Sequence, residues 1–422
     1  MIYNDQVTQR TAAIKKFSIW LLILVLTSFI SFLAAYFYLK ADAPSNLLKP
    51  KLDSVNQQKE LPLLAYSIEN LNKLASEATA PIQAKEIISK DLEKQVYVLL
   101  FSYQSQGKNI SGALNVKITD DNSTEKMPVI LMLRGYAPLD GYYSGEGTKN
   151  VAAVFADNNY VTLAPDFLGY GQSDSEPNNT WEARFIKPLN VIDLIKTIQK
   201  FPEVDLSLIT DLPIKKISLD ADRIGLWGHS NGGQIAVSTL EALESNLPTT
   251  LWAPVLAPFP YSILYFTDEN ADEGKEIRKY LSQFEEDYNV FDFSITQHLD
   301  RLYGPIQIQH GTDDDSALVE WSEEFLAKID LENAIREASN STNVQGVKND
   351  LDATIVNTDT NVSASTGAGV DANVGTSTDA STSAKKALIK IDFYKYPAAN
   401  HNLQPYWNEA VQKDLDFFEQ NL

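Results

Sequence analysis

Short apolar runs recur along residues 96–422, separated by polar turns and by longer amphipathic stretches. Apolar runs of this length indicate buried strands. Two of the intervening segments, Glu182–Lys200 and Gly233–Glu244, have the periodicity of helices. Strands alternating with helices predict an α/β fold, with a mostly parallel, twisted sheet and helices on both faces. The expected strands are Val129–Leu133, Tyr160–Leu163, Ile224–Trp227, Thr250–Trp252, Pro305–Gln309 and Leu388–Tyr394.

The chain before this alternation has a different pattern. Val96–Ser102 and Ile110–Ile118 flank a polar turn, which predicts an antiparallel hairpin ahead of the parallel strands. Residues 61–95 predict an accessory helical segment that packs on the core, and residues 40–60, polar with two prolines, predict a linker. The helical spacing in 61–95 is carried by Leu64, Ile68, Leu71 and Leu74.

The amino end contains a long uncharged stretch. Phe17–Leu39 is 23 residues without a charge, enough to cross a bilayer as a helix. Lys15 and Lys16 precede it, so we expect residues 1–16 to stay in the cytoplasm and the rest to lie outside as a single-pass, membrane-anchored domain. The alternative is a cleaved signal peptide ending near Ala43 and a secreted protein. The length favours an uncleaved anchor, since a signal-peptide apolar region usually runs about 7–15 residues.

Two segments interrupt the strand–helix alternation. Residues 258–302 are acidic and helix-prone, and we expect them to form a cap-like excursion near the carboxyl edge of the sheet. Its aromatic residues Phe259, Tyr261 and Tyr265 either line a substrate pocket or pack under the cap. Residues 338–384 are rich in small and polar residues, which predicts a disordered surface insertion.

Composition excludes several classes of function. The net charge of −21 argues against a nucleic-acid partner and against electrostatic docking on anionic lipid. The chain has no cysteine, which rules out disulfides, thiolate catalysis and cysteine–zinc sites. With four dispersed histidines and no H-E-x-x-H motif, we expect no catalytic metal. The lone Gly145-Glu146-Gly147 is too short for a phosphate-binding loop, so no cofactor is expected.

The motif Gly228-His229-Ser230-Asn231-Gly232 carries the chemistry. It follows the predicted strand at 224–227 and opens the predicted helix at 233–244. In that context G-x-S-x-G indicates a nucleophile elbow, a tight turn that exposes a serine hydroxyl beside a helix amino terminus. The sequence therefore predicts Ser230 as a nucleophile.

A serine hydroxyl needs a base, usually a histidine. His229 lies inside the elbow and would point away from the hydroxyl, His298 falls in an expected surface helix, and His310 ends a strand. His401 remains, in a polar loop between the last strand and the closing helix. A carboxylate to orient it is expected from Asp313-Asp314-Asp315, which lies between nucleophile and base; Asp314 is favoured and Asp313 is the alternative.

Two backbone amides are candidates for stabilising an oxyanion. The first belongs to Asn231, directly after the nucleophile, and the second to Tyr136, in the loop after the 129–133 strand. Arg134 begins this loop, and we interpret it as a structural residue that forms a salt bridge beneath it.

These motifs together resemble the α/β-hydrolase fold over residues 96–422, and in detail the prolyl oligopeptidase-like serine peptidases. Three segments carry the resemblance: Gly228–Gly233, His310–Asp314 and Tyr396–His401. The segment Ala164–Asp174 is also similar to an Asp-x-x-Gly-x-Gly-x-Ser loop common in α/β-hydrolases. The resemblance implies that the aspartate of His-Gly-x-x-Asp is catalytic, which supports Asp314.

The chain departs from that family in two ways. Full-length members place a large β-propeller before the catalytic domain, and the residues between 39 and 96 are too few for one. Asp314 and His401 are 87 residues apart, more than one helix and one strand require, and the 338–384 insertion accounts for the excess.

The sequence thus predicts a serine hydrolase that acts through an acyl-enzyme on small peptide or ester substrates. The resemblance favours a peptidase, and a carboxylesterase of the same fold is the alternative. A catalytically inactive extracytoplasmic binding module is a further alternative, disfavoured because no triad member is missing. The sequence does not indicate an oligomeric state.

Overall fold

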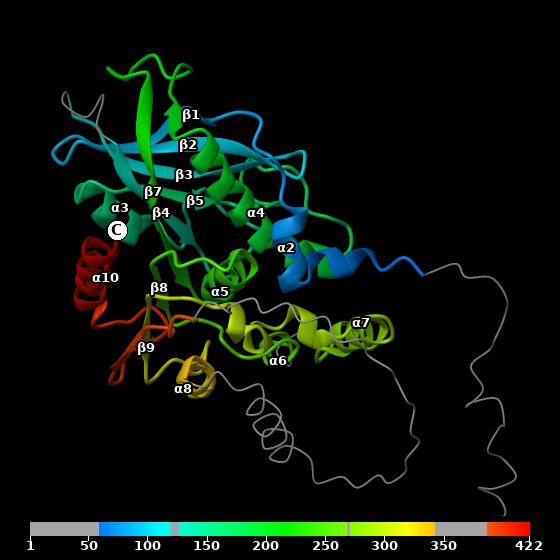
Figure 1. Ribbon diagram of the computed structural model, residues 1–422. Helices are drawn as coiled ribbons and strands as arrows, with labels where there is room; N and C mark the ends of the chain where they lie inside the picture. Colours follow the sequence, from blue (N-terminus) through cyan, green and yellow to red (C-terminus); the bar gives the residue numbers. More distant parts are fainter. Residues whose placement is uncertain (1–58, 120–125, 268–270, 342–385) are drawn as a thin grey trace, which may run out of the picture. The chain divides into compact units, whose positions relative to one another are not determined.

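The computed structural model describes residues 59–119, 126–267, 271–341 and 386–422 (Figure 1). The predicted membrane segment 17–39, the tail before it and nearly all of the 40–60 linker lie outside these residues, as does most of the 338–384 insertion. In the parts of the chain that are described, no helix is both long and apolar enough to cross a membrane.

A ten-stranded sheet organises the described residues, in the order β10-β9-β8-β7-β4-β5-β3-β2-β1-β6. The strands from β5 through β4, β7, β8 and β9 to β10 are parallel, whereas β1, β2, β3 and β5 pair antiparallel. This confirms the parallel set and the leading hairpin. The strands are β1 (Ile82–Asp91), β2 (Val96–Ser105), β3 (Lys108–Lys117), β4 (Met127–Leu133), β5 (Val161–Pro165), β6 (Glu203–Asp205), β7 (Lys216–His229), β8 (Thr249–Trp252), β9 (Ile306–Gly311) and β10 (Ile391–Tyr396).

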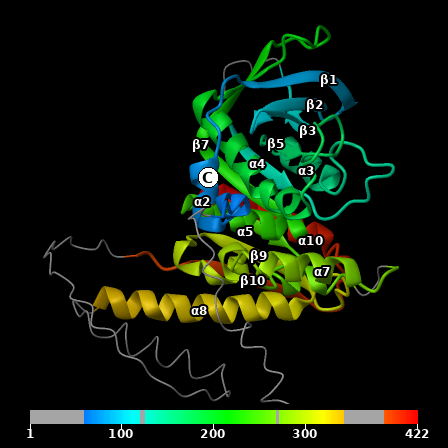
Figure 2. The ribbon, with the colours of Figure 1, turned by 90° about the vertical axis from the view of Figure 1, so that its right-hand side faces the viewer.

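Helices cover both faces of the sheet. In Figure 1, α3 and α10 lie on one side of it and α4 and α5 on the other. The long helix α8 packs beside β9, below β9 and β10 in Figure 2. The helices are α2 (Ile68–Leu74), α3 (Lys149–Asp157), α4 (Thr180–Lys200), α5 (Asn231–Leu243), α6 (Tyr261–Leu264), α7 (Lys275–Glu285), α8 (Val319–Ser341) and α10 (Trp407–Asn421), with 3₁₀ turns η1 (Pro62–Tyr66), η2 (Val290–Phe293), η3 (Ile295–Gln297) and η4 (Leu299–Arg301).

The central strand β4 shows why the sheet strands read as continuous apolar runs. Ile130 and Met132 pack into the cluster that contains α3 and α10. Val129, Leu131 and Leu133 point the other way, into the larger cluster formed with α4 and α5. Successive side chains of a strand face opposite sides of the sheet, so a strand covered on both faces must be apolar at every position.

The accessory segment 61–95 is only partly helical. Ile68 and Leu71 are buried in α2, as their spacing predicts. Residues 82–91, however, form the strand β1, which pairs with β2, so the helical interpretation is wrong there. Ile82 and Ala84 are buried in strand alternation, and pairing with β2 satisfies the backbone of this segment.

The two interruptions also differ in detail from expectation. Helix α8 continues through Ser341, so the low-complexity insertion cannot begin at Ala338. The 258–302 excursion consists of α6, α7 and the turns η2 to η4, with residues 268–270 not described. The α7 residues Leu281 and Phe284 are buried in a cluster with Trp181 at the start of α4.

One buried carboxyl group ties the last helix to three strands. Asp414 on α10 accepts hydrogen bonds from Trp227 on β7 (3.1 Å), Trp252 on β8 (2.8 Å), and Gln307 and Gln309 on β9 (3.0 and 2.7 Å). Burial raises the pKa of Asp414 to about 7, although these donors act in the opposite direction. The carboxyl group therefore binds a proton more tightly in the folded chain than an ordinary aspartate does.

This pKa predicts a pH dependence of stability. The unfolded pKa is about 3.9, so the contribution of Asp414 is fully present below about pH 4 and is lost as the pH rises through about 7. An Asp414→Asn variant cannot titrate at this position. We expect the unfolding free energy of the wild type, relative to the variant, to fall by on the order of 3 kcal/mol between pH 4 and pH 7. Urea unfolding of both proteins across this range measures the difference, and a constant difference would contradict the assignment.

Candidate active site

Ser230 lies at the junction of β7 and α5, in the turn that the G-x-S-x-G motif predicts. Its φ of 56° and ψ of −122° are rare for a residue with a side chain. Hydrogen bonds hold this conformation: the Ser230 amide donates to the Trp252 carbonyl (2.9 Å), and the Ser230 carbonyl accepts from the amides of Gly233 and Val255 (3.0 Å each). The expected strained elbow is confirmed.

Close packing around the turn requires the motif glycines. A Cβ on Gly228 would lie 2.7 Å from the Gly232 carbonyl oxygen. A Cβ on Gly232 would collide with the Leu133 carbonyl oxygen at the end of β4. The first turn of α5 therefore sits directly against the end of β4, and the loop that follows β4 passes beside Ser230.

The structure brings His401 and Asp314 together across 87 residues of sequence. His401, in the loop after β10, has its Nδ1 at 3.0 and 2.8 Å from Asp314 Oδ1 and Oδ2. Asp314 is buried and its Oδ1 also accepts from the amides of Ser316 and Ala317 (2.9 Å each). Asp313 is exposed, and among the described residues it makes no hydrogen bond to His401, so the geometry favours Asp314 over Asp313 as the partner of His401.

His310 is a further neighbour of this carboxylate, a contact that was not predicted from the sequence. Its fully buried ring accepts from Ser322 Oγ at Nδ1 (2.8 Å). Its Nε2 donates to the Ala317 carbonyl (2.8 Å) and lies 3.2 Å from Asp314 Oδ2. The His-Gly-x-x-Asp spacing is the signal that could have found it.

These contacts keep Asp314 ionised. Burial alone would raise its pKa, but the hydrogen bonds from His310 and His401 and from the Ala317 amide outweigh burial and hold the pKa well below its usual range. An ionised carboxylate at Nδ1 fixes the His401 tautomer that leaves Nε2 free to accept a proton.

His229 connects the elbow to the His401 loop. Its Nε2 donates to the His401 carbonyl (3.0 Å), and the two rings lie 4.7 Å apart. Burial, together with the nearby His401, lowers the pKa of His229 to about 4, so its ring is neutral near pH 7. His229 is therefore a hydrogen-bonding residue between the elbow and the His401 loop. No hydrogen bond between Ser230 Oγ and His401 Nε2 occurs among the described residues; active-site hydrogen bonds are often long before substrate binds.

His298 differs from expectation, because it does not lie in a surface helix. It is 8% exposed, follows the short turn η3, and its Nε2 lies 3.1 Å from the Phe291 carbonyl oxygen. This partner is within the cap-like excursion and away from the elbow. His298 is therefore a buried structural residue of that segment.

The two candidate oxyanion donors flank Ser230. Asn231 is the first residue of α5, and Tyr136 lies in the loop after β4. A Cβ on Gly135 would lie 2.8 Å from Ser230 Cβ and 3.4 Å from Ser230 Oγ, so this loop touches the nucleophile. Neither the Asn231 amide nor the Tyr136 amide donates a hydrogen bond within the described part of the chain.

Arg134 supports this loop from below, but the expected salt bridge is not found among the described residues. Its guanidinium donates to the carbonyls of Gly135 and Asp166 (2.9 Å each) and lies 4.2 Å from the centre of the Tyr170 ring. Hydrogen bonds to carbonyl oxygens and contact with an aromatic face therefore fix the residue. The side chain is buried.

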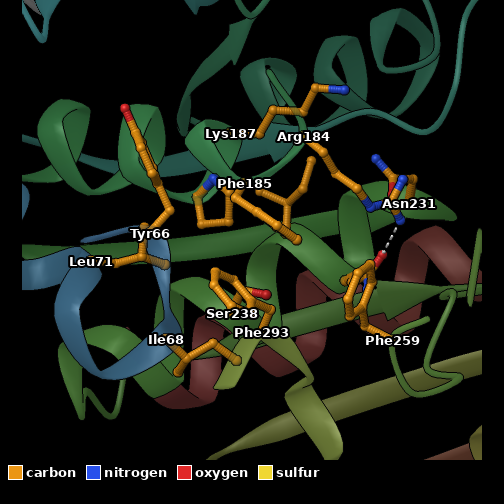
Figure 3. Close-up of a pocket in the computed structure, with 13 residues that line it drawn as sticks. Tyr66, Ile68, Leu71, Arg184, Phe185, Lys187, Asn231, Ser238, Phe259 and Phe293 are labelled. Atoms are coloured by element: carbon orange, nitrogen blue, oxygen red, sulfur yellow. Dashed lines mark hydrogen bonds between the residues drawn. The ribbon is translucent and has the colours of Figure 1, made fainter. Parts of the chain in front are cut away.

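A pocket adjoins the elbow, shown in Figure 3. Of the three aromatic residues predicted for a pocket, only Phe259 lines it. Tyr261 is 67% exposed, and Tyr265 packs instead on Phe266 and Trp321, so neither belongs to the lining. The predicted lining was wrong for these two because Tyr261 faces solvent and Tyr265 packs toward Trp321 of α8. The remaining lining is Tyr66, Ile68, Leu71, Arg184, Phe185, Lys187, Pro188, Asn231, Gln234, Ile235, Ser238 and Phe293.

Comparison with known proteins agrees with this geometry. The prolyl oligopeptidase family matches residues 204–348, which include the elbow and Asp314. No curated protein matches the chain. Among solved structures, an acetyl xylan esterase from Paenibacillus sp. R4 superposes with a TM-score of 0.54 at 14% identity, covering 89% of this chain and 97% of the esterase.

Two further solved structures show weaker similarity. Acetyl xylan esterase 1 from Thermoanaerobacterium sp. JW/SL YS485 has a TM-score of 0.48 at 14% identity, over 84% of this chain and 94% of that one. A putative dipeptidyl aminopeptidase IV from Bacteroides ovatus has a TM-score of 0.43 at 14% identity, over 81% of this chain and 43% of that one. The family match and the architecture together identify an α/β-hydrolase fold that resembles the prolyl oligopeptidase catalytic domain. They also identify the protein as a serine hydrolase.

Proposed function

We propose that this serine hydrolase forms an acyl-enzyme on Ser230 and cleaves peptide or amide bonds of small substrates. The observation that carries the proposal is the strained Ser230 elbow beside the hydrogen-bonded pair of His401 and Asp314. The backbone conformation of Ser230 is unfavourable by itself and is held in place by the surrounding packing. Backbone strain of this kind is typical of functional positions.

In the proposed reaction Ser230 Oγ attacks the substrate carbonyl carbon while His401 Nε2 takes the hydroxyl proton. The tetrahedral intermediate collapses as the same proton passes to the leaving nitrogen or oxygen, whose bond to the carbonyl breaks. Water then attacks the acyl-enzyme, again giving its proton to His401, and the acid product leaves as Ser230 recovers its proton. Asp314 stabilises the imidazolium at each stage.

The Asn231 and Tyr136 amides are the proposed oxyanion donors. Both lie next to Ser230 in sequence or in space, and both are unpaired within the described residues. An N–H group that is already positioned and lacks a partner can stabilise developing negative charge without reorganising, which is the usual source of much of the rate enhancement.

The bond that is cleaved is the finer part of the proposal. The family match over residues 204–348 supports a peptide or amide bond. The alternative is an ester, because the same nucleophile, base and oxyanion donors act on both carbonyl classes. The aromatic side chains of Phe185, Phe259 and Phe293 in the adjoining pocket suit an apolar group in either substrate class.

The same Asp→Asn substitution should have very different effects on turnover at Asp314 and at the neighbouring Asp313. Asp314→Asn is expected to lower kcat by about 10⁴-fold, because the amide favours the wrong tautomer of His401. Asp313→Asn is the matched control, since Asp313 is exposed, and it should stay within about 3-fold of the wild type. Steady-state kinetics with thermal unfolding measure both. A large loss in Asp313→Asn together with normal turnover in Asp314→Asn would reverse the assignment.

The substrate class is tested with pairs of substrates that have the same acyl group and differ in whether the cleaved bond is an amide or an ester. We expect aminoacyl para-nitroanilides to be hydrolysed with kcat/KM within the range of about 10⁴–10⁸ M⁻¹s⁻¹ that is common for enzymes. The Ser230→Ala substitution should abolish this hydrolysis. Hydrolysis of the corresponding para-nitrophenyl esters alone would assign the enzyme to the carboxylesterases. Failure to cleave either class, with the fold intact, would favour the inactive binding module.

We further propose that residues 17–39 anchor the enzyme in the cell membrane with residues 40–422 outside. The support is in the sequence: 23 uncharged residues preceded by Lys15 and Lys16. The competing proposal is a protein secreted after cleavage near Ala43.

The topology predicts two outcomes for intact spheroplasts. External protease should digest the domain, and alkaline carbonate should leave the full-length chain in the membrane pellet, because a spanning helix stays in the bilayer. A soluble form that begins just after Ala43 would support the secreted alternative. A domain fully protected from external protease would contradict both outward-facing proposals.

A further inference from the structure

Two basic side chains line the pocket beside the elbow. Arg184 and Lys187 are three residues apart on α4, so they project from the same side of the helix. In Figure 3 the Arg184 side chain extends toward Asn231, the residue that follows the proposed nucleophile. Arg184 is therefore close to the proposed site of reaction, and Lys187 lines the same pocket.

Neither cation pairs with a carboxylate of the described residues. Within the described residues, the Arg184 guanidinium donates a hydrogen bond from Nη2 to the neutral Gln234 Oε1 at 3.2 Å. No ion pair within 4.0 Å joins Arg184 or Lys187 to a carboxylate in the described part of the chain. This is notable in a chain whose net charge is −21, where acidic groups outnumber basic ones.

The surroundings also disfavour these charges. Both side chains are half-buried. Burial lowers the pKa of Arg184 to about 10. Burial, and then the charges of Arg184 and Arg134, lower the pKa of Lys187 to about 8, while Glu176 acts in the opposite direction. A cation that is partly desolvated without a counter-charge is costly, and a bound anion would offset that cost.

We propose that this pocket binds a carboxylate of the substrate, held by Arg184 with Lys187 as the second cation. The guanidinium is suited to a carboxylate because it can donate two parallel hydrogen bonds. Phe185, Phe259 and Phe293 line the same pocket and accommodate the apolar part that joins the carboxylate to the reacting carbonyl. This inference rests on the proposed function, because it names the substrate class of that site.

The carboxylate can belong to the acyl part of the substrate or to its leaving group, and two ester pairs distinguish them. For the acyl part, mono-para-nitrophenyl adipate is compared with its neutral amide, para-nitrophenyl adipamate. For the leaving group, para-acetoxybenzoate is compared with para-acetoxybenzamide. Within each pair the size is matched and only the charge differs. We expect a higher kcat/KM for the acid in one pair.

The variants test whether Arg184 and Lys187 cause that preference. Arg184→Gln is expected to lower the ratio of kcat/KM for acid over amide by about 10- to 100-fold, the range for a charge-assisted hydrogen bond. Lys187→Gln should act in the same direction, and Arg184→Lys, which keeps the charge, should retain most of the preference. The control is Lys200→Gln, at the far end of α4, where the exposed Lys200 pairs with Glu77. It should leave the ratio unchanged.

Direct binding separates this inference from the proposed function. In Ser230→Ala, calorimetric titration should show that adipate binds and adipamide does not, and the further substitution Arg184→Gln should abolish adipate binding. If no ester is hydrolysed yet adipate binds through Arg184, the proposed function fails and the carboxylate site stands. Equal rates for acid and amide in both pairs, or a preference that survives the Arg184→Gln/Lys187→Gln double variant, would overturn the site.

Discussion

The backbone of Ser230 is the constraint on which the site depends. A φ of 56° at a serine is unfavourable by itself, and it persists because three hydrogen bonds and the packing of α5 against the end of β4 leave no alternative. The same turn sets the direction of α5. It thereby places the Asn231 amide beside the nucleophile and Gln234, one turn further on, against Arg184.

Around this turn, the half-buried His229 and the buried His310 act as positioning groups. His229 holds the carbonyl of His401, and His310 holds both Asp314 and the carbonyl of Ala317. Loops that are far apart in the sequence are thus fixed to the end of the sheet by specific hydrogen bonds. Asp414 has a comparable role deeper in the sheet, where it joins α10 to β7, β8 and β9.

Much of this arrangement could be predicted from the sequence, because it depends on local patterns. The parallel strands, the hairpin of β2 and β3, and the elbow each have a signal within a few residues. Strand β1 was missed because irregularities between Ala84 and Glu86 and between Ile87 and Ser89 interrupt its two-residue alternation. The extent of β7 was underestimated for a related reason: its first half carries partly exposed residues and pairs with β6, which has no strong pattern of its own.

The features that escaped prediction depend on tertiary packing. Nothing near Arg184 in the sequence says that α4 would turn it toward Gln234 on α5 rather than toward solvent. The pocket lining was misassigned for Tyr261 and Tyr265 because α6 is only one turn long, and its orientation is set by the residues that it contacts. The choice between Asp313 and Asp314 likewise required the structure, since only burial and the contact with His401 separate them.

The central claim is that Ser230 is the nucleophile, and the position of a covalent adduct tests it most directly. A fluorophosphonate reacts with a serine that is activated by a neighbouring base and spares ordinary serines. After labelling of the folded protein, mass spectrometry of the digested chain should find one phosphonylated residue, Ser230. Absence of an adduct, or an adduct on another serine while Ser230 stays unmodified, would contradict the account.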